Sequence, residues 1–511
     1  MWLRHRLEVI TALVAAVLGG AYLTAPRMGS DLAAQVGRAE FFAAHGWTPI
    51  DLRWYAGVNQ LGYSLVSQPV MALLGARLTG VVSLVTGSVL LVLLFRRTGG
   101  VRLWVAAPLG VAGLAGNLVS GRVTYGLGVC LGLAALLALT WLPRRAAAAA
   151  AAVLAALAAA TSPVVGLFLG LAGTALLLSR RVPAGLLIAV PAAVPMGVSA
   201  LFLGDGGWMN ISRTDTLHAV LTGLLVAALV RARPIRIGAL LSSAGVLAAA
   251  LVHTPVGLNA TRLAVMFALP VLAAYATLPD RWAKRTVTAG ILALVAWWQP
   301  PVVSADLRDI GNPAADPAYF RPLTDRLAAA PLTGRVEIPP TRDYWEAARL
   351  GDVPLARGWL RQADIDRNPL FFTTVPGAAG TGVPLTAESY RAWLAEQAVQ
   401  FVAVPDTELS WSGRAEERLV TAGLPYLTPV WSDAHWRLYA VAGPQPIVAA
   451  PATLVRHTAA SITLDAPAAG DVHLRVRWYR WLTGSGGAEV IRDGHWTILR
   501  VPGPGRYTIS S

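Results

Sequence analysis

The sequence predicts an α-helical polytopic membrane domain followed by a soluble extracytoplasmic region with an α/β part and a β-sandwich. The mean hydropathy is +0.54 and only 14% of the residues are charged, which favours a membrane protein. Up to residue 302, apolar residues fall into blocks of roughly 15 to 20, enough for a helix to cross a hydrocarbon core of about 30 Å. Residues 303–511 instead hold 20 basic and 21 acidic side chains, as a soluble domain would.

The apolar blocks predict about eleven membrane-spanning helices. We expect them at residues 9–25, 79–95, 103–119, 123–142, 146–161, 163–178, 183–203, 216–230, 237–252, 262–278 and 286–302. An alternative for the first block is a cleaved signal peptide. Segment 61–78 is also apolar, but a span there would reverse every later loop, so we interpret it as re-entrant or interfacial.

Basic residues fix the expected orientation. The first 302 residues carry 22 basic and 7 acidic side chains, and this excess indicates topology rather than a nucleic-acid partner. The short connections of one face hold most of them: Arg4, Arg6, Arg96, Arg97, Arg102, Arg144, Arg145, Arg180, Arg181, Arg231, Arg233, Arg236, Arg281, Lys284 and Arg285. The positive-inside rule then predicts a multi-pass plasma-membrane protein with a cytoplasmic N-terminus and an extracytoplasmic C-terminal region.

Three domains are expected. Residues 1–302 form the membrane domain, with a long first outward loop at 26–78. Strand-like and helix-like segments alternate in the following part, which predicts an α/β domain over 303–445, and short strands broken by Gly and Pro predict a β-sandwich over 446–511. Tryptophans in these domains fit either a packed core or sugar stacking.

The first outward loop carries the most informative residues. After Pro26 and Gly29, residues 31–45 suit an amphipathic helix lying at the membrane surface, with Asp31 and Gln35 on one face. Asp31 fits two roles: a residue that complements the helix dipole, or a general base on the outer side. Few acidic residues of the membrane half face outward, which favours the second role: Asp31, Glu40, Asp51, Asp205 and Asp215.

This loop, which continues as "DLRWYAGVNQLGYSLVSQPV", resembles that of the GT-C class of membrane glycosyltransferases. The segment "GLNATRLAVMFALPVLAA" at 257–274 is similar to a late span of the class, and a soluble domain after the last span resembles the actinobacterial arabinosyl- and mannosyltransferases. The resemblance implies a polyprenyl-phosphate sugar donor in the outer leaflet and a glycan or lipid acceptor. It also implies that Asp31 is the catalytic base, with Asp51 in reserve.

A lipid phosphate needs cations near the outer interface, and Arg262, Arg122 and Arg53 are the candidates. Each also fits an arginine that snorkels to the interface. Further candidates for substrate binding, which an aromatic belt or structural hydrogen bonding would equally explain, are Gln35, Trp54, Tyr55, Tyr63, His253 and Asn259. The second acidic residue of the class has no clear counterpart, although Asp205 and Asp215 are candidates. A divalent metal is therefore left open, and no metal-ligand spacing is found.

The leading hypothesis is a cell-envelope glycosyltransferase. A transporter or flippase for a lipid-linked precursor is the alternative, but it predicts charged residues in the middle of several spans, and these are nearly absent. A catalytically silent assembly protein is the third reading. Lys284 is the only lysine and alanine is abundant, which suggests a high-GC genome such as that of an actinobacterium.

Overall fold

The computed structural model describes residues 5–141, 144–278, 284–378 and 382–511. Arg4 and Arg281, two of the arginines used for the expected orientation, lie outside the described residues. The chain divides into two compact units. The first unit comprises Met1–Gln35, Gly62–Gly204 and Trp208–Gly311, and the second comprises Val36–Leu61, Asp205–Gly207 and Asn312–Ser511. Residues 36–61, about half of the loop predicted at 26–78, therefore belong to the unit that contains the C-terminal region.

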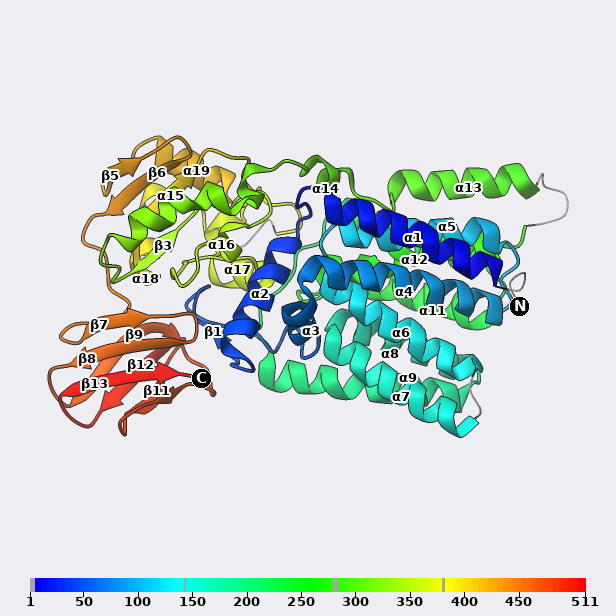
Figure 1. Ribbon diagram of the computed structural model, residues 1–511, viewed down its shortest axis with the longest axis horizontal. Helices are drawn as coiled ribbons and strands as arrows, with labels where there is room; N and C mark the ends of the chain where they lie inside the picture. Colours follow the sequence, from blue (N-terminus) through cyan, green and yellow to red (C-terminus); the bar gives the residue numbers. More distant parts are fainter. Residues whose placement is uncertain (1–4, 142–143, 279–283, 379–381) are drawn as a thin grey trace. The chain divides into compact units, whose positions relative to one another are not determined.

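The first unit is a bundle of helices, and a helix lies at each of the apolar blocks (Figure 1). Its helices are α1 (Arg6–Thr24), α3 (Ser67–Leu74), α4 (Ala76–Arg97), α5 (Leu103–Val119), α6 (Val123–Trp141), α7 (Arg144–Thr161), α8 (Pro163–Leu178), α9 (Val182–Val198), α10 (Arg213–Leu229), α11 (Arg233–Leu251), α12 (Arg262–Tyr275), α13 (Lys284–Trp298) and α14 (Ser304–Arg308). A π-helical turn η2 (Ser199–Leu203) extends α9, and a 3₁₀ turn η3 (Gly257–Thr261) precedes α12.

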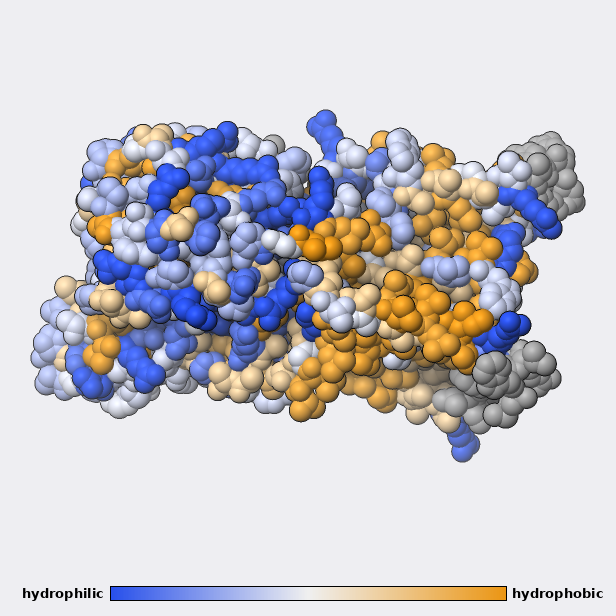
Figure 2. Space-filling view, turned by 45° about the horizontal axis from the view of Figure 1, so that its top comes forward, coloured by the Kyte–Doolittle hydropathy of each residue, from blue (hydrophilic) through white to orange (hydrophobic). Residues whose placement is uncertain are grey.

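Six of the described helices are long and apolar enough to cross a membrane: Arg6–Thr24, Ala76–Arg97, Val123–Thr140, Val182–Leu203, Arg233–Leu251 and Gly257–Tyr275. Shorter apolar helices cover Leu103–Val119, Arg145–Thr161, Pro163–Leu178 and Arg285–Trp298. Large apolar side chains on α1, α9 and α11 are exposed, and hydrophobic residues dominate the visible surface of the helical unit (Figure 2). Exposed apolar surface of this extent requires a lipid environment, so the chain is a membrane protein.

The two ends of this bundle differ in charge. At one end, here named the arginine end, lie the helix ends and connections that carry Arg96, Arg97, Arg102, Arg180, Arg181, Arg231, Arg233 and Arg236. Backbone contacts join these connections, such as Val101 N to Ala274 O at 3.0 Å and Thr277 N to Leu229 O at 2.9 Å. The opposite end is named the site end. It includes α3, whose 8 residues rise only about 12 Å and do not cross a membrane.

Helix α2 (Leu32–His45) runs from the first unit into the second. In the second unit it is followed by a small hairpin of β1 (Ile50–Asp51) and β2 (Val58–Asn59). Ile50 and Leu52 lie in the same hydrophobic core as the C-terminal strands, and Leu52 N donates to Ala459 O at 2.8 Å. This packing explains why residues 36–61 fold with the C-terminal region.

A four-stranded sheet with the order β3-β4-β6-β5 forms the first part of the C-terminal region. Strands β3 and β4 are parallel and the other pairs are antiparallel. The strands are β3 (Arg335–Glu337), β4 (Val399–Pro405), β5 (Leu427–Ser432) and β6 (Trp436–Val441), and the helices are α15 (Pro317–Ala328), α16 (Glu346–Arg349), α17 (Arg361–Arg367), α18 (Ala387–Glu396) and α19 (Arg414–Thr421). Short 3₁₀ turns lie at η4 (Pro313–Ala315) and η5 (Pro369–Phe371).

Two further sheets follow, with the orders β10-β13-β8-β7 and β11-β12-β9. Alternate residues of β8, β9 and β12 are buried, as expected for sheets with one packed face. Both sheets contribute to one core, so they form a sandwich. The strands are β7 (Thr453–His457), β8 (Ser461–Ala466), β9 (Gly470–Arg477), β10 (Thr483–Gly484), β11 (Glu489–Asp493), β12 (Trp496–Val501) and β13 (Gly505–Ser510).

A buried charge cluster holds the α/β part together. The Arg357 guanidinium lies 2.8 Å from Asp364, 3.0 Å from Glu416 and 3.8 Å from Glu337. Burial raises the pKa of Glu416 to about 7 although Arg357 opposes this, and the Tyr390 hydroxyl donates to its Oε1 at 2.9 Å. A single guanidinium does not neutralise three buried carboxylates, so the cluster retains a proton.

Candidate functional site

The N-termini of three helices lie close together in the first unit. Asp31 directly precedes α2, Arg122 directly precedes α6, and Arg262 is the first residue of α12. The N-termini of α6 and α12 carry the positive ends of their helix dipoles, which favour an anion nearby. Local sequence patterns do not show that these residues are close together, because Arg122 follows Asp31 by about 90 residues and Arg262 follows Arg122 by 140 residues.

The side chains of these three residues form a cluster at the site end. The Asp31 Oδ2 lies 3.4 Å from Arg122 Nε and 3.5 Å from Arg262 Nη2. The three side chains are 14%, 26% and 19% exposed, respectively, so solvent screens them only in part. Both distances exceed the roughly 2.8 Å of a strong charge-assisted hydrogen bond. The two guanidiniums therefore retain donors for a further anion.

Aromatic packing fixes Arg262. Its guanidinium lies over the Tyr125 ring, 5.1 Å from the centroid, where cation–π attraction supplements the ion pair. The Tyr125 side chain is buried, and its hydroxyl has no hydrogen-bond partner within the described part of the chain. Tyr125 is not among the residues predicted from the sequence, although it lies one helical turn after Arg122 and so shares its helix face.

A polar network adjoins the charged cluster. The Gln35 Nε2 donates to the Tyr63 hydroxyl at 2.9 Å, and its Oε1 accepts from the Thr124 hydroxyl at 2.6 Å. Thr124 also contacts the Ser67 hydroxyl of α3 at 2.8 Å. Gln35 lies one turn after Asp31, and Tyr63 interacts electrostatically with Arg262. The structure thus brings together Asp31, Arg122, Arg262, Gln35 and Tyr63 among the predicted site residues.

Four predicted residues lie instead within the second unit and are buried there. Asp51 accepts from Arg53 Nη2 at 2.7 Å and from Gln60 Nε2 at 2.6 Å. Burial would lower the pKa of Arg53, but the Asp51 carboxylate outweighs it, and the pKa ends above its ordinary value. Trp54 Nε1 donates to Ala347 O at 3.1 Å, and the Tyr55 hydroxyl donates to Gly358 O. A carboxylate and two rings that are fully buried in this way hold a core together and do not receive substrate.

The remaining candidates are also outside the charged cluster. His253 is exposed and stacks on Trp208 with ring centroids 4.0 Å apart, and Asn259 lies in η3. Asp205 accepts hydrogen bonds from the Tyr479 hydroxyl at 2.6 Å and from Arg367 Nη2 at 3.3 Å. Asp215 forms a capping contact with Ser212 at the start of α10. Both aspartates are thus engaged by residues other than Asp31, Arg122 and Arg262.

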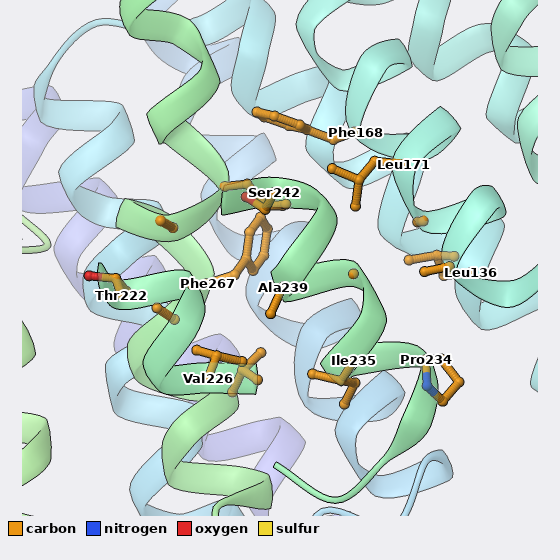
Figure 3. Close-up of a pocket in the computed structure, with 18 of the residues that line it drawn as sticks. Leu136, Phe168, Leu171, Thr222, Val226, Pro234, Ile235, Ala239, Ser242 and Phe267 are labelled. Atoms are coloured by element: carbon orange, nitrogen blue, oxygen red, sulfur yellow. The ribbon is translucent and has the colours of Figure 1, made fainter. Parts of the chain in front are cut away.

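A hydrophobic cavity of about 290 Å³ lies in the same bundle (Figure 3). Residues of α6, α8, α10, α11 and α12 line it, and Phe168, Leu171, Phe267 and Ile235 point into it (Figure 3). Its lining along α12 begins at Leu263, the residue after Arg262, and continues to Val271, a rise of about 12 Å. Pro234 and Ile235 extend it to the first turn of α11 at the arginine end.

An aromatic pair links the cavity to the charged cluster. The Phe168 ring lines the cavity and packs edge-on against Tyr125, with centroids 6.4 Å apart. Tyr125 in turn lies beneath Arg262. An anion held by Arg262 would therefore lie within one helical turn of apolar space that suits a hydrocarbon chain.

No protein-family model matches the chain, and no curated protein sequence matches it either. Among solved structures, the chain is similar to the mycobacterial arabinofuranosyltransferase AftD, with a TM-score of 0.47, 18% identity and coverage of 91% of this chain. Two classes of a mutant AftD give TM-scores of 0.44 and 0.45 at 18% and 17% identity, covering 87% and 91% of this chain. The chain spans about 41% of the length of the first AftD structure and 42% and 43% of the two mutant classes.

Proposed function

We propose that the chain is a GT-C-type glycosyltransferase of the cell envelope, which transfers a sugar from a polyprenyl-phosphate donor to a glycan or lipid acceptor. The observation that carries this proposal is the cluster of one carboxylate between two guanidiniums at the end of an apolar helical bundle. By the positive-inside rule the arginine end is cytoplasmic and the site end faces outward. Arg122 and Arg262 bind the donor phosphate, and Asp31 is the base.

The charges of the cluster change in step with this reaction. With Asp31 ionised, the cluster carries a net charge of +1, which matches the single negative charge of a phosphodiester donor. Asp31 takes the proton from the acceptor hydroxyl, the acceptor oxygen bonds to the anomeric carbon, and the bond from that carbon to the phosphate oxygen breaks. The electron pair stays on the lipid phosphate, whose charge becomes −2 as the cluster becomes +2. The arginines would thus stabilise the phosphate more strongly as it gains negative charge in the transition state, and such preferential stabilisation accelerates a reaction.

The apolar cavity supports a donor with a hydrocarbon tail. A free sugar nucleotide would gain nothing from the apolar side chains of α12, whereas a prenyl chain attached to a phosphate at Arg262 would bury its methylenes against Leu263 and Phe267. Thr222 and Ser242 also line the cavity, and the Thr222 hydroxyl donates to His218 O of its own helix at 2.7 Å.

A divalent metal does not fit this cluster. Both contacts of Asp31 Oδ2 are arginines within 3.5 Å, and two positive charges so close would repel a third of charge +2. No group of three or more His, Cys, Asp or Glu side chains suited to a metal occurs in the described ranges. We therefore assign phosphate binding to arginine alone.

The decisive experiment uses full-length protein in lipid nanodiscs with a panel of radiolabelled polyprenyl-phosphate pentoses and hexoses and envelope acceptors. Asp31→Asn should lower kcat by about 10²- to 10⁴-fold, the usual contribution of a general base. Its KM for the donor should stay the same or fall, because the net charge of the cluster rises to +2. Asp215→Ala, which removes an aspartate from the first turn of α10 in the same unit, is the matched control.

Transfer that survives Asp31→Asn with an unchanged kcat would reject Asp31 as the base. If the native protein transfers sugar from none of these donors, the proposed glycosyltransferase activity is rejected. Donor movement across the bilayer without transfer would favour the flippase alternative, and neither activity would favour a silent assembly protein.

A further inference from the structure

Two buried carboxylates of the first unit have no role in the proposed chemistry. Asp306 lies in α14 and Asp309 directly follows it, shortly after the last apolar helix α13. They are only 6% and 1% exposed. Because burying a carboxylate is costly unless donors surround it, their hydrogen bonds should show what they stabilise.

Their hydrogen bonds go to the two loops that carry Asp31 and Arg122. Gly29 N donates to Asp309 Oδ2 at 3.2 Å, and Ser30 N donates to Asp306 Oδ1 at 3.3 Å. The other oxygen of Asp306 accepts from the Ser120 hydroxyl at 2.5 Å. Asp306 therefore accepts hydrogen bonds from both loops.

The two loops approach each other too closely for other side chains. Asp31 N donates to Ser120 O at 3.1 Å. Gly29 has a φ of +105°, and a Cβ there would lie 2.2 Å from Val119 O. Gly121 has a φ of +72°, and a Cβ there would lie 2.5 Å from Leu32 N. Glycine is required at both positions, so the loops interlock through backbone, and Asp306 bridges them at their centre.

We propose that Asp306 is a positioning residue that holds the loops at 29–31 and 119–122 in register, so that Asp31 and Arg122 face a single substrate. This inference rests on the proposed function. Asp306 contacts the residue directly before Asp31 and the residue two positions before Arg122. A loss of that bridge lets the base and the phosphate ligand separate, and a displacement of about 1 Å at such a site costs on the order of 100-fold in rate.

The test compares Asp306→Ala with Asp306→Asn in the full-length protein. The asparagine variant can still accept from Ser30 N and bond the Ser120 hydroxyl, so we expect its kcat to stay within about threefold of native. The alanine variant should lose about 10- to 100-fold in kcat. In an Asp31→Ala background, Asp306→Ala should cost little more, because a residue that acts through Asp31 is not additive with it.

Hydrogen–deuterium exchange gives a readout that needs no donor. Asp306→Ala should speed exchange of the peptide that contains residues 29–31, whereas Asp306→Asn and the control Asp215→Ala should not. If Asp306→Ala leaves the exchange rate of this peptide unchanged, Asp306 does not hold the two loops together, whatever the transfer activity of the variant. Fully additive losses with Asp31→Ala would overturn the positioning role. Faster exchange in a protein whose native form transfers no sugar would leave the bridge standing and reject the proposed function instead.

Discussion

Replacing Arg262 by glutamine tests the phosphate site most directly. The change lowers the net charge of the cluster from +1 to 0, and it removes the guanidinium that lies 3.5 Å from Asp31 and over Tyr125. A hydrogen bond to a charged group contributes about 1.5 to 3 kcal/mol. Donor affinity should therefore fall by about 10- to 150-fold, and kcat should fall as well because the leaving phosphate gains charge.

Arg77 offers a matched control for this prediction. Its guanidinium also stacks on a tyrosine, 4.9 Å from the Tyr22 centroid, and donates to Ala25 O at 2.8 Å. It forms no ion pair with Asp31 in the described chain. Arg77→Gln thus removes a charge and a cation–π contact in the same unit while leaving the cluster intact.

The assay measures initial transfer rates over a range of donor concentrations, with the thermal unfolding midpoint of each variant recorded in parallel. Arg262→Gln should raise the KM for the donor at an unfolding midpoint similar to that of Arg77→Gln. Equal kinetic constants for the two variants would refute the assignment of the phosphate to Arg262.

Three further predictions follow from the same structure. Burial raises the pKa of Glu346 to about 7, so its folded state binds a proton that the unfolded chain releases near pH 4.5, and this residue lowers the free energy of unfolding by about 3 kcal/mol as pH rises from 4.5 to 7. Glu346→Gln should remove this contribution and make unfolding midpoints fall less steeply with pH, while the slope due to Glu416 remains; a slope equal to that of the native protein would contradict the prediction. Ala239→Phe should fill the apolar cavity and lower the affinity for a long-tailed donor at least about tenfold relative to that for a soluble short-tailed analogue. An equal loss of affinity for both donors would exclude the cavity as the binding site of the tail. Thr124→Val leaves Gln35 Oε1 without its donor, so the free energy of unfolding, followed by circular dichroism, should fall by about 1 to 3 kcal/mol. The control Thr140→Val removes a hydroxyl that bonds only a carbonyl of its own helix, and it should lower the free energy of unfolding less.

Much of the membrane half could be predicted because its signals are local. Apolar blocks of helical length and arginine pairs in short connections are properties of neighbouring residues, and the helices begin and end close to the expected positions. Asp31 and Gln35 also follow from local periodicity, since four residues bring side chains to one helix face. The β-rich character of the C-terminal region was also predicted from a local signal, namely short strand-like segments broken by Gly and Pro.

The opening loop shows where local signals fail. Residues 31–45 and 50–55 are close in sequence, and both segments contain charged and aromatic side chains, so both were predicted to belong to one site. In the structure Asp51, Arg53, Trp54 and Tyr55 are buried in the second unit. Whether a polar side chain faces a substrate or a core depends on which distant segment covers it, and composition carries no information on that.

The sequence by itself determined that the chain crosses a membrane, that the arginines gather at one end of the helical bundle, and that a helix begins near Asp31 at the opposite end. Each of these features depends on residues only a few positions apart. Only the tertiary structure decided that Arg122 and Arg262 flank Asp31, that Tyr125 lies beneath Arg262, and that Asp306 bridges two loops. Those contacts join residues tens to hundreds of positions apart, and they form only when long-range packing of helices brings their ends together.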